Sequence, residues 1–287
     1  MNIARLIGLA INVSMAMMVL SVALSAGGAR LREAFRNPGL LARALAAMFV
    51  VMPVIAVLIA RNSGLNRALL VALLLLALSP VPPVLPSKQI KAGGGAAFVL
   101  GLFVVSAVAA ILVVPIGVTL IGRLFGRDLE VPFSVTGTIV GPSVLLPVIA
   151  GLLIARFAPD FAGRVARPIS TSAGILLLAA FVPVLWTAWP AVVAQMTNFT
   201  LVAIVGFVAV GLLTGHLLGG PDPETRTALA LATATRHPGV TLAVLGVVEP
   251  ANREVMPVIL LYLLVGMIAS APYIAWRKSR DPGGKKG

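Results

Sequence analysis

Arg236 and His237 stand side by side in the middle of an apolar run, ALATATRHPGVTLAVLG at 230–246. Ionisable side chains are costly inside a membrane, so residues of this kind are candidates for a functional role. Pro238 and Gly239 follow directly. Proline lacks a backbone N–H and disfavours the helical region for the residue before it, while glycine accepts almost any backbone angle. The pattern therefore predicts a helix that stops near Arg236 and starts again near Gly239, inside the membrane.

A broken helix of this kind places backbone carbonyls and amides near the bilayer midplane, where secondary transporters bind substrates and ions. The alternative interpretation is a proline-kinked helix whose arginine and histidine only reach a wet surface. Neither an enzyme nor a resident metal is expected. The chain has no cysteine and only two histidines, and its nine carboxylates all fall at the ends of the apolar runs or outside them.

Arg236 and His237 must be held in place by the long apolar runs that make up most of the chain. The 287 residues are 59% hydrophobic and 11% charged, a composition typical of a polytopic membrane protein. Runs long enough to cross a bilayer as helices fall at about 4–26, 40–60, 66–86, 94–122, 132–157, 168–189, 197–219, 224–248 and 253–276. We therefore predict an all-α protein with about nine transmembrane helices. The first run is expected to be a retained span and not a removed signal peptide.

The basic residues predict the orientation, because cytoplasmic connections carry an excess of lysine and arginine. Fifteen flank the runs on one side: Arg30, Arg32, Arg36, Arg43, Lys88, Lys91, Arg156, Arg164, Arg167, Arg226, Arg277, Lys278, Arg280, Lys285 and Lys286. Six flank them on the other: Arg5, Arg61, Arg67, Arg123, Arg127 and Arg253. We expect a multi-pass protein of the cytoplasmic membrane with a basic cytoplasmic tail at 277–287 and the N-terminus outside. The partner expected from this distribution is the lipid bilayer and not nucleic acid, and no oligomeric state is predicted.

The third apolar run is also interrupted. It ends in SPVPPVLPSKQ, which predicts a broken segment near 79–91 with helix breaks at Pro82, Pro83 and Pro86. Two broken segments, one in each half of the chain, indicate a transporter built from an inverted repeat. The alternative for the proline cluster is a rigid loop at the membrane surface. The two halves are expected at 1–127, with four spans, and at 128–276, with five.

Several stretches together resemble the bile acid:sodium symporter family. These are MVLSVALSAGGARLREAFRNPGLL at 18–41, FVVMP at 49–53, LLPVIAGLLIARFAP at 145–159 and TATRHPGVTLAVL at 233–245, which stands where the family has its second crossing helix. The resemblance covers nearly the whole chain. It implies a core domain with two broken crossing helices, a panel domain and transport of organic anions. The family's first helix is expected to be missing, which accounts for nine spans where ten are usual.

The chain departs from the family at its sodium site. Sodium-coupled members carry Gly-Gly-Thr-Ala-Ser-Asn in the first broken helix, where this chain reads PPVLPSKQ at 82–89. In the second broken helix, Ala232 stands at the position of a glutamate, and Arg236 and His237 replace Gln-Asn. A hard cation such as sodium prefers several oxygen ligands with a negative charge among them. We therefore expect no conventional sodium site and no cofactor.

A built-in cation would replace sodium. We expect the Arg236 guanidinium to neutralise the negative end of the half-helix that it terminates. Facing it, the amides of Val240, Thr241 and Leu242 would form an anion site for a carboxylate or sulfonate. The predicted substrate-binding residues are Arg236, His237, Gly239, Val240, Thr241, Thr233 and Thr235. His237 would also couple transport to protons. The alternative for Arg236 is a purely structural role that holds the crossed helices together.

The residues and the resemblance thus predict a secondary transporter of a small organic anion that works by alternating access. Proton coupling or uncoupled exchange is preferred to sodium coupling. Two alternatives remain open: an ordinary sodium:organic-anion symporter, and a non-transporting membrane sensor or partner that kept the fold.

Overall fold

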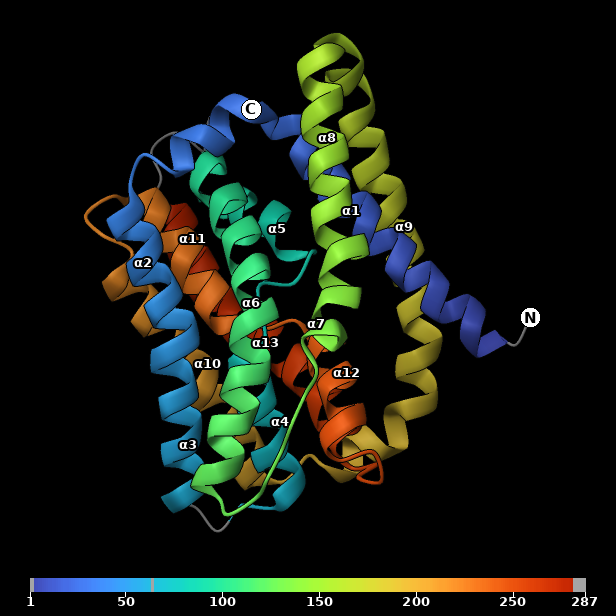
Figure 1. The fold of residues 1–287 in the computed structure, drawn as a ribbon, viewed down its shortest axis with the longest axis vertical. Helices are drawn as coiled ribbons and strands as arrows, with labels where there is room; N and C mark the ends of the chain where they lie inside the picture. Colours follow the sequence, from blue (N-terminus) through green and yellow to red (C-terminus); the bar gives the residue numbers. More distant parts are fainter. Residues whose placement is uncertain (1–2, 63–64, 281–287) are drawn as a thin grey trace.

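The computed structural model describes residues 3–62 and 65–280, except for the side chains of residues 3–4, 26–34 and 62. Within these ranges every regular element is a helix (Figure 1). Part of the predicted basic flank lies outside this description, namely the side chains of Arg30 and Arg32 and the tail residues 281–287.

Seven helices of the described chain are long and apolar enough to cross a membrane. Five are uninterrupted: α1 (Ile3–Ala34), α6 (Ala96–Leu124), α9 (Pro159–Ala194), α10 (Asn198–Leu218) and α13 (Val255–Ser279). Two continue through a π-helical turn: α2 (Pro38–Ala46) through Ala47–Val51 into α3 (Met52–Asn62), and α7 (Phe133–Val140) through Gly141–Leu145 into α8 (Leu146–Phe157).

The remaining two predicted spans are each a pair of shorter helices. The run at 66–86 is α4 (Arg67–Leu78) followed by α5 (Leu85–Lys91), and the run at 224–248 is α11 (Pro223–Ala234) followed by α12 (Pro238–Val248). The first break is shorter than expected: α5 is helical because a proline is tolerated in the first helical turn. The count of nine crossings and the inverted repeat remain predictions.

Each π-helical turn directly precedes a proline near the start of the next helix, Pro53 in one case and Pro147 in the other. In the first turn, the amide of Met52 donates to the carbonyl of Ala47, five residues back. The same spacing would pair the Met48 carbonyl with Pro53, which has no N–H to donate. The turn therefore leaves the Met48 carbonyl in need of another partner.

The helices form two groups in Figure 1. One group consists of α1, α8 and α9, which pack along one another, and the other contains α4, α6 and α10 to α13. α1 also packs against α6, and α9 against α13, so the two groups are in contact.

Glycines at every fourth position bring α10 against the backbone of α11. A Cβ on Gly211, Gly215 or Gly219 would lie 2.9, 2.5 and 2.5 Å, respectively, from a Cα atom of α11. No side chain larger than hydrogen fits at these positions without displacing backbone. The contact holds α11 in place, and α11 in turn positions the Arg236 segment at its end.

Candidate functional site

The two broken segments meet at Ser79 and the three residues between α11 and α12. α4 ends at Leu78 because Ser79 precedes Pro80 and adopts extended backbone. α11 ends at Ala234 and α12 begins at Pro238, so the second break spans Thr235 to His237, slightly earlier than predicted. The His237 amide donates to the Ser79 hydroxyl over 3.0 Å, which joins one break to the other.

Arg236 is fully buried at this junction. Its Nη1 donates to the carbonyl of Ser79 and its Nη2 to the carbonyl of Met48, each over 3.2 Å. Ser79 is the C-cap of α4, and Met48 lies in the first π-helical turn. One guanidinium thus satisfies an end carbonyl of α4 and the carbonyl that the π-helical turn leaves open.

This geometry corrects one prediction. Arg236 does not neutralise the end of α11, the half-helix that precedes it in sequence, but the end of α4. At the end of α11 the Ala234 carbonyl accepts a hydrogen bond of 2.6 Å from the hydroxyl of Tyr262 on α13. A cation near a helix C-terminus is stabilising for the same dipole reason in both cases, but the helix concerned is the opposing one.

His237 is the N-cap of α12, and this corrects the expected anion site. Its Nδ1 accepts from the amides of Gly239 and Val240 at 3.1 and 3.4 Å, and its carbonyl accepts from the amide of Thr241 at 3.2 Å. The amides at the start of α12 are therefore not free. Because Nδ1 accepts, it carries no proton, and in the neutral ring Nε2 carries it. Nε2 is buried without a hydrogen-bond partner among the described residues.

The other predicted substrate-binding residues fall into two groups, buried and partly exposed. Thr233 and Thr241 are buried, and their hydroxyls donate to carbonyls one helical turn back, those of Leu229 and His237, at 2.8 and 3.0 Å. Val240 is buried as well. Thr235 and Gly239 are partly exposed. Pro238 is also partly exposed, so Thr235, Pro238 and Gly239 are the partly exposed residues of the segment 233–241.

The predicted helix breaks are placed as follows. Pro82 and Pro83 lie between α4 and α5, Pro86 lies in the first turn of α5, and Pro238 is the first residue of α12. Pro86 therefore does not break a helix. In the described part of the chain, no three histidine, aspartate or glutamate side chains gather as a metal site would require.

A contact that sequence reasoning missed holds α5 against α11. Gln89 is buried, and its Nε2 donates to the carbonyl of Ala228 over 2.6 Å. A Cβ on Gly94 would lie 3.3 Å from Cβ of Ala228, and one on Gly95 would lie 2.7 Å from a carboxylate oxygen of Glu224. The glycine cluster after α5 was a visible signal of this close approach.

Comparison with known proteins supports the family resemblance. Residues 12–195 match the model of the Sodium Bile acid symporter family. The chain belongs to the sodium bile acid symporter family. It is also 28% identical over 213 residues to the P3 protein of Bos taurus. That match covers 72% of this chain but only 42% of the bovine protein, so the chain spans less than half the length of that relative.

The family match includes the first broken segment, α4–α5, and ends before the second. Arg236 and His237 lie beyond residue 195, where the match stops. Membership in the sodium bile acid symporter family and the apolar helices together show a multi-pass membrane protein of a transporter family.

Proposed function

We propose that this chain is a secondary transporter of a small organic anion, which it moves across the cytoplasmic membrane by alternating access. Family membership supports transport as the activity. Two interrupted segments that meet inside the helix assembly are the arrangement that transporters use for a central site. The grouping of α1, α8 and α9 apart from the crossing supports a panel that rocks against a core.

The observation that carries this proposal is the position of Arg236. Sodium would need several oxygen ligands at the crossing. The Ser79 and Met48 carbonyls at that place already accept from a guanidinium, and a second cation beside it would be repelled. The residues present therefore do not fit a sodium ion there, and transport is proposed to run without conventional sodium coupling.

The substrate anion is proposed to approach the break from the face of Thr235 and Gly239. Arg236 lies behind them and does not touch the anion, but it sets a positive potential in a water-poor region where charges interact strongly. The buried predicted contacts, Thr233, Val240 and Thr241, then support the backbone of the break.

His237 is proposed as a structural cap in an uncoupled exchanger. A proton on Nδ1 would remove both hydrogen bonds to the amides of Gly239 and Val240, and would add a cation at the positive end of α12 beside Arg236. Proton coupling through His237 is the second candidate mechanism, since Nε2, which carries the proton of the neutral ring, has no hydrogen-bond partner among the described residues.

Thermal unfolding of the detergent-purified protein tests the proposal. Small carboxylates and sulfonates are added in sodium and in potassium salt, at two pH values. A bound anion at about 100 times its Kd should add about 2.7 kcal/mol to the unfolding free energy, equally in both salts. Thr235→Val should reduce this stabilisation, whereas Thr171→Val, an exposed threonine of α9, should not.

Stabilisation that requires sodium would overturn the mechanism and restore an ordinary sodium:organic-anion symporter. Binding without exchange of labelled anion in proteoliposomes would favour the non-transporting sensor or partner.

A further inference from the structure

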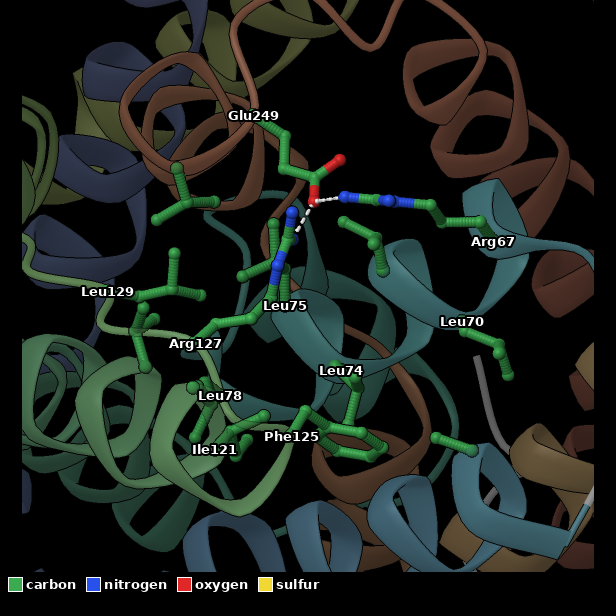
Figure 2. Close-up of a pocket in the computed structure, with 15 residues that line it drawn as sticks. Arg67, Leu70, Leu74, Leu75, Leu78, Ile121, Phe125, Arg127, Leu129 and Glu249 are labelled. Carbon is green, nitrogen blue, oxygen red and sulfur yellow. Dashed lines mark hydrogen bonds and ion pairs between the residues drawn. The ribbon is translucent and has the colours of Figure 1, made fainter.

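A leucine-lined cavity of about 230 Å³ lies away from the crossing, between α4, the last turns of α6 and the end of α12 (Figure 2). Its walls are apolar and come from both sides: Leu70, Leu74, Leu75 and Leu78 from α4, and Ile121 and Phe125 from the end of α6. One lining residue, Leu78, directly precedes the crossing residue Ser79 in the chain.

The mouth of the cavity carries an unbalanced charge. Arg67 and Arg127 both donate to the same carboxylate oxygen of Glu249, over 2.5 Å in the case of Arg67. Asn252 donates to the other oxygen at 3.0 Å. Two guanidinium groups against one carboxylate leave one positive charge. Figure 2 shows both arginines converging on Glu249 above the leucines.

Both arginines retain binding capacity. A guanidinium has five N–H donors, and each of these two uses one toward a described residue. Their side chains are 62% and 45% exposed, whereas that of Glu249 is 8% exposed. An incoming anion can therefore reach the free donors without displacing Glu249.

The cavity has the dimensions of one chain. Arg67 and Leu78 are eleven residues apart on α4, a rise of about 16 Å. The volume of about 230 Å³ is below the roughly 300–1,000 Å³ of ordinary ligand pockets. A lipid with two acyl chains would leave one chain outside, whereas a single alkyl chain can lie among the leucines.

We propose that this cavity is a binding site for a single-chain amphipathic anion, a medium-chain fatty carboxylate. Its carboxylate binds Arg67 and Arg127, and its alkyl chain lies between α4 and α6. The site is separate from the proposed transport site and does not depend on it.

Binding of radiolabelled decanoate to the full chain in phosphatidylcholine nanodiscs tests the site. Arg67→Gln and Arg127→Gln should each weaken binding by about three- to tenfold, because each removes charged donors. Leu74→Trp, which fills the cavity, should abolish saturable binding. Arg123→Gln is the matched control: it removes the same charge from an exposed arginine at the same end of α6 that does not line the cavity.

Glu249→Gln is expected to increase decanoate binding, a result that misfolding of a variant cannot produce. It removes the neighbouring negative charge, which repels an incoming carboxylate, and should strengthen decanoate binding by about two- to fivefold. Equal binding by the wild type and the Arg67→Gln/Arg127→Gln double variant would overturn the proposal, as would equal loss in Arg123→Gln. Absence of saturable decanoate binding, with phosphatidylglycerol retained instead by the purified protein, would assign the cavity to membrane lipid and would also overturn it.

Discussion

Helix α4 has arginine at both of its ends, in opposite electrostatic settings. At its C-terminus Arg236 is buried and, among the described residues, donates to two carbonyls, in the place where a helix dipole favours a cation. At its N-terminus Arg67, the first residue of α4, stands where the dipole disfavours one. Glu249, the C-cap of α12, is likewise at the wrong end of its own helix for a carboxylate.

The ion pair at the mouth therefore joins two charges that are each poorly placed on their own helices. Arg236 needs no carboxylate because it has a helix end and an open π-turn carbonyl as partners. A helix C-terminus can therefore stabilise a buried cation in place of a counter-ion. We therefore expect Arg236 to contribute far more to the unfolding free energy than the exposed pair of Arg67 and Glu249. Water can replace a lost hydrogen-bond partner at the mouth of the cavity but not at the buried crossing.

The largest effect is expected for Arg236→Met. The substitution leaves the Ser79 and Met48 carbonyls buried without donors, at about 1–3 kcal/mol each, so we expect a loss of about 2–6 kcal/mol of unfolding free energy. The unfolding free energy of Arg236→Lys should lie between those of the wild type and Arg236→Met, because lysine keeps the charge but not the planar fork of donors. Denaturant unfolding of the purified protein measures the loss. Arg253→Met, at an exposed site, is the control, and equal stability of the two methionine variants would show that the buried arginine contributes no more to stability than an exposed one.

The second largest loss of stability is expected for a substitution in the contact between α10 and α11. Gly215→Ala places a Cβ 2.5 Å from the Cα of Ala230 and the carbonyl oxygen of Leu229. Overpacking of this kind costs about 1–3 kcal/mol and would shift α11, so substrate binding should fall together with stability. Gly206→Ala on the same helix meets nothing within 4 Å and should be neutral or slightly stabilising. If both variants behaved alike in thermal unfolding, α10 would not be the support of the crossing.

His237 should give a smaller effect. His237→Leu removes the N-cap of α12 and should cost about 1 kcal/mol, whereas His237→Asn keeps a side-chain acceptor and should lose less. The pH profile of anion exchange in proteoliposomes should be the same for His237→Asn and the wild type. A profile that flattened in His237→Asn would give His237 the proton-carrying role and contradict the structural one.

The breaks themselves could be predicted because their causes are local. Arg-His-Pro-Gly and the proline cluster after Ser79 disrupt helices by their own backbone chemistry, whatever surrounds them. The partners of Arg236 could not be predicted in this way. Ser79 and Met48 are 157 and 188 positions away in the chain, and apolar periodicity does not indicate which helix end lies opposite a given residue.

Other features of the site are visible in the sequence, but their spatial partners are known only from the structure. Three glycines at intervals of four, two in α10 and one directly after it, mark a close helix contact but do not indicate which helix is the neighbour. Pro53 and Pro147 mark the helices that contain π-helical turns, although most prolines inside helices of this chain do not produce one. The expectation of free amides after Gly239 was wrong because His237 caps α12 and accepts hydrogen bonds from the amides of Val240 and Thr241.

The smallest effect is expected for Glu249→Gln, and its pH dependence is the sharpest check of the exposed pair. Burial opposes ionisation of Glu249, but hydrogen bonds from Arg67, Asn252 and Arg127 outweigh it and lower its pKa from 4.5 to about 2. A carboxyl whose pKa is lower in the folded state stabilises the fold fully above its unfolded pKa, and loses that contribution as the pH falls through the folded value. Because Arg67 and Arg127 are exposed, the contribution at pH 7 should not exceed about 1 kcal/mol.

The difference in unfolding free energy between the wild type and Glu249→Gln should therefore be constant from pH 7 to about pH 5. It should shrink between pH 4.5 and about 2, and it should be smaller at high salt. Glu254→Gln, which removes an exposed carboxylate without an ion pair in the described chain, should show no such trend. A difference that stayed unchanged down to pH 2 would mean that Glu249 acts through its shape and its hydrogen bond to Asn252. In that case the ion pair at the N-terminus of α4 would stabilise the fold by packing and not by charge, and the electrostatic contrast between the two ends of α4 would not hold.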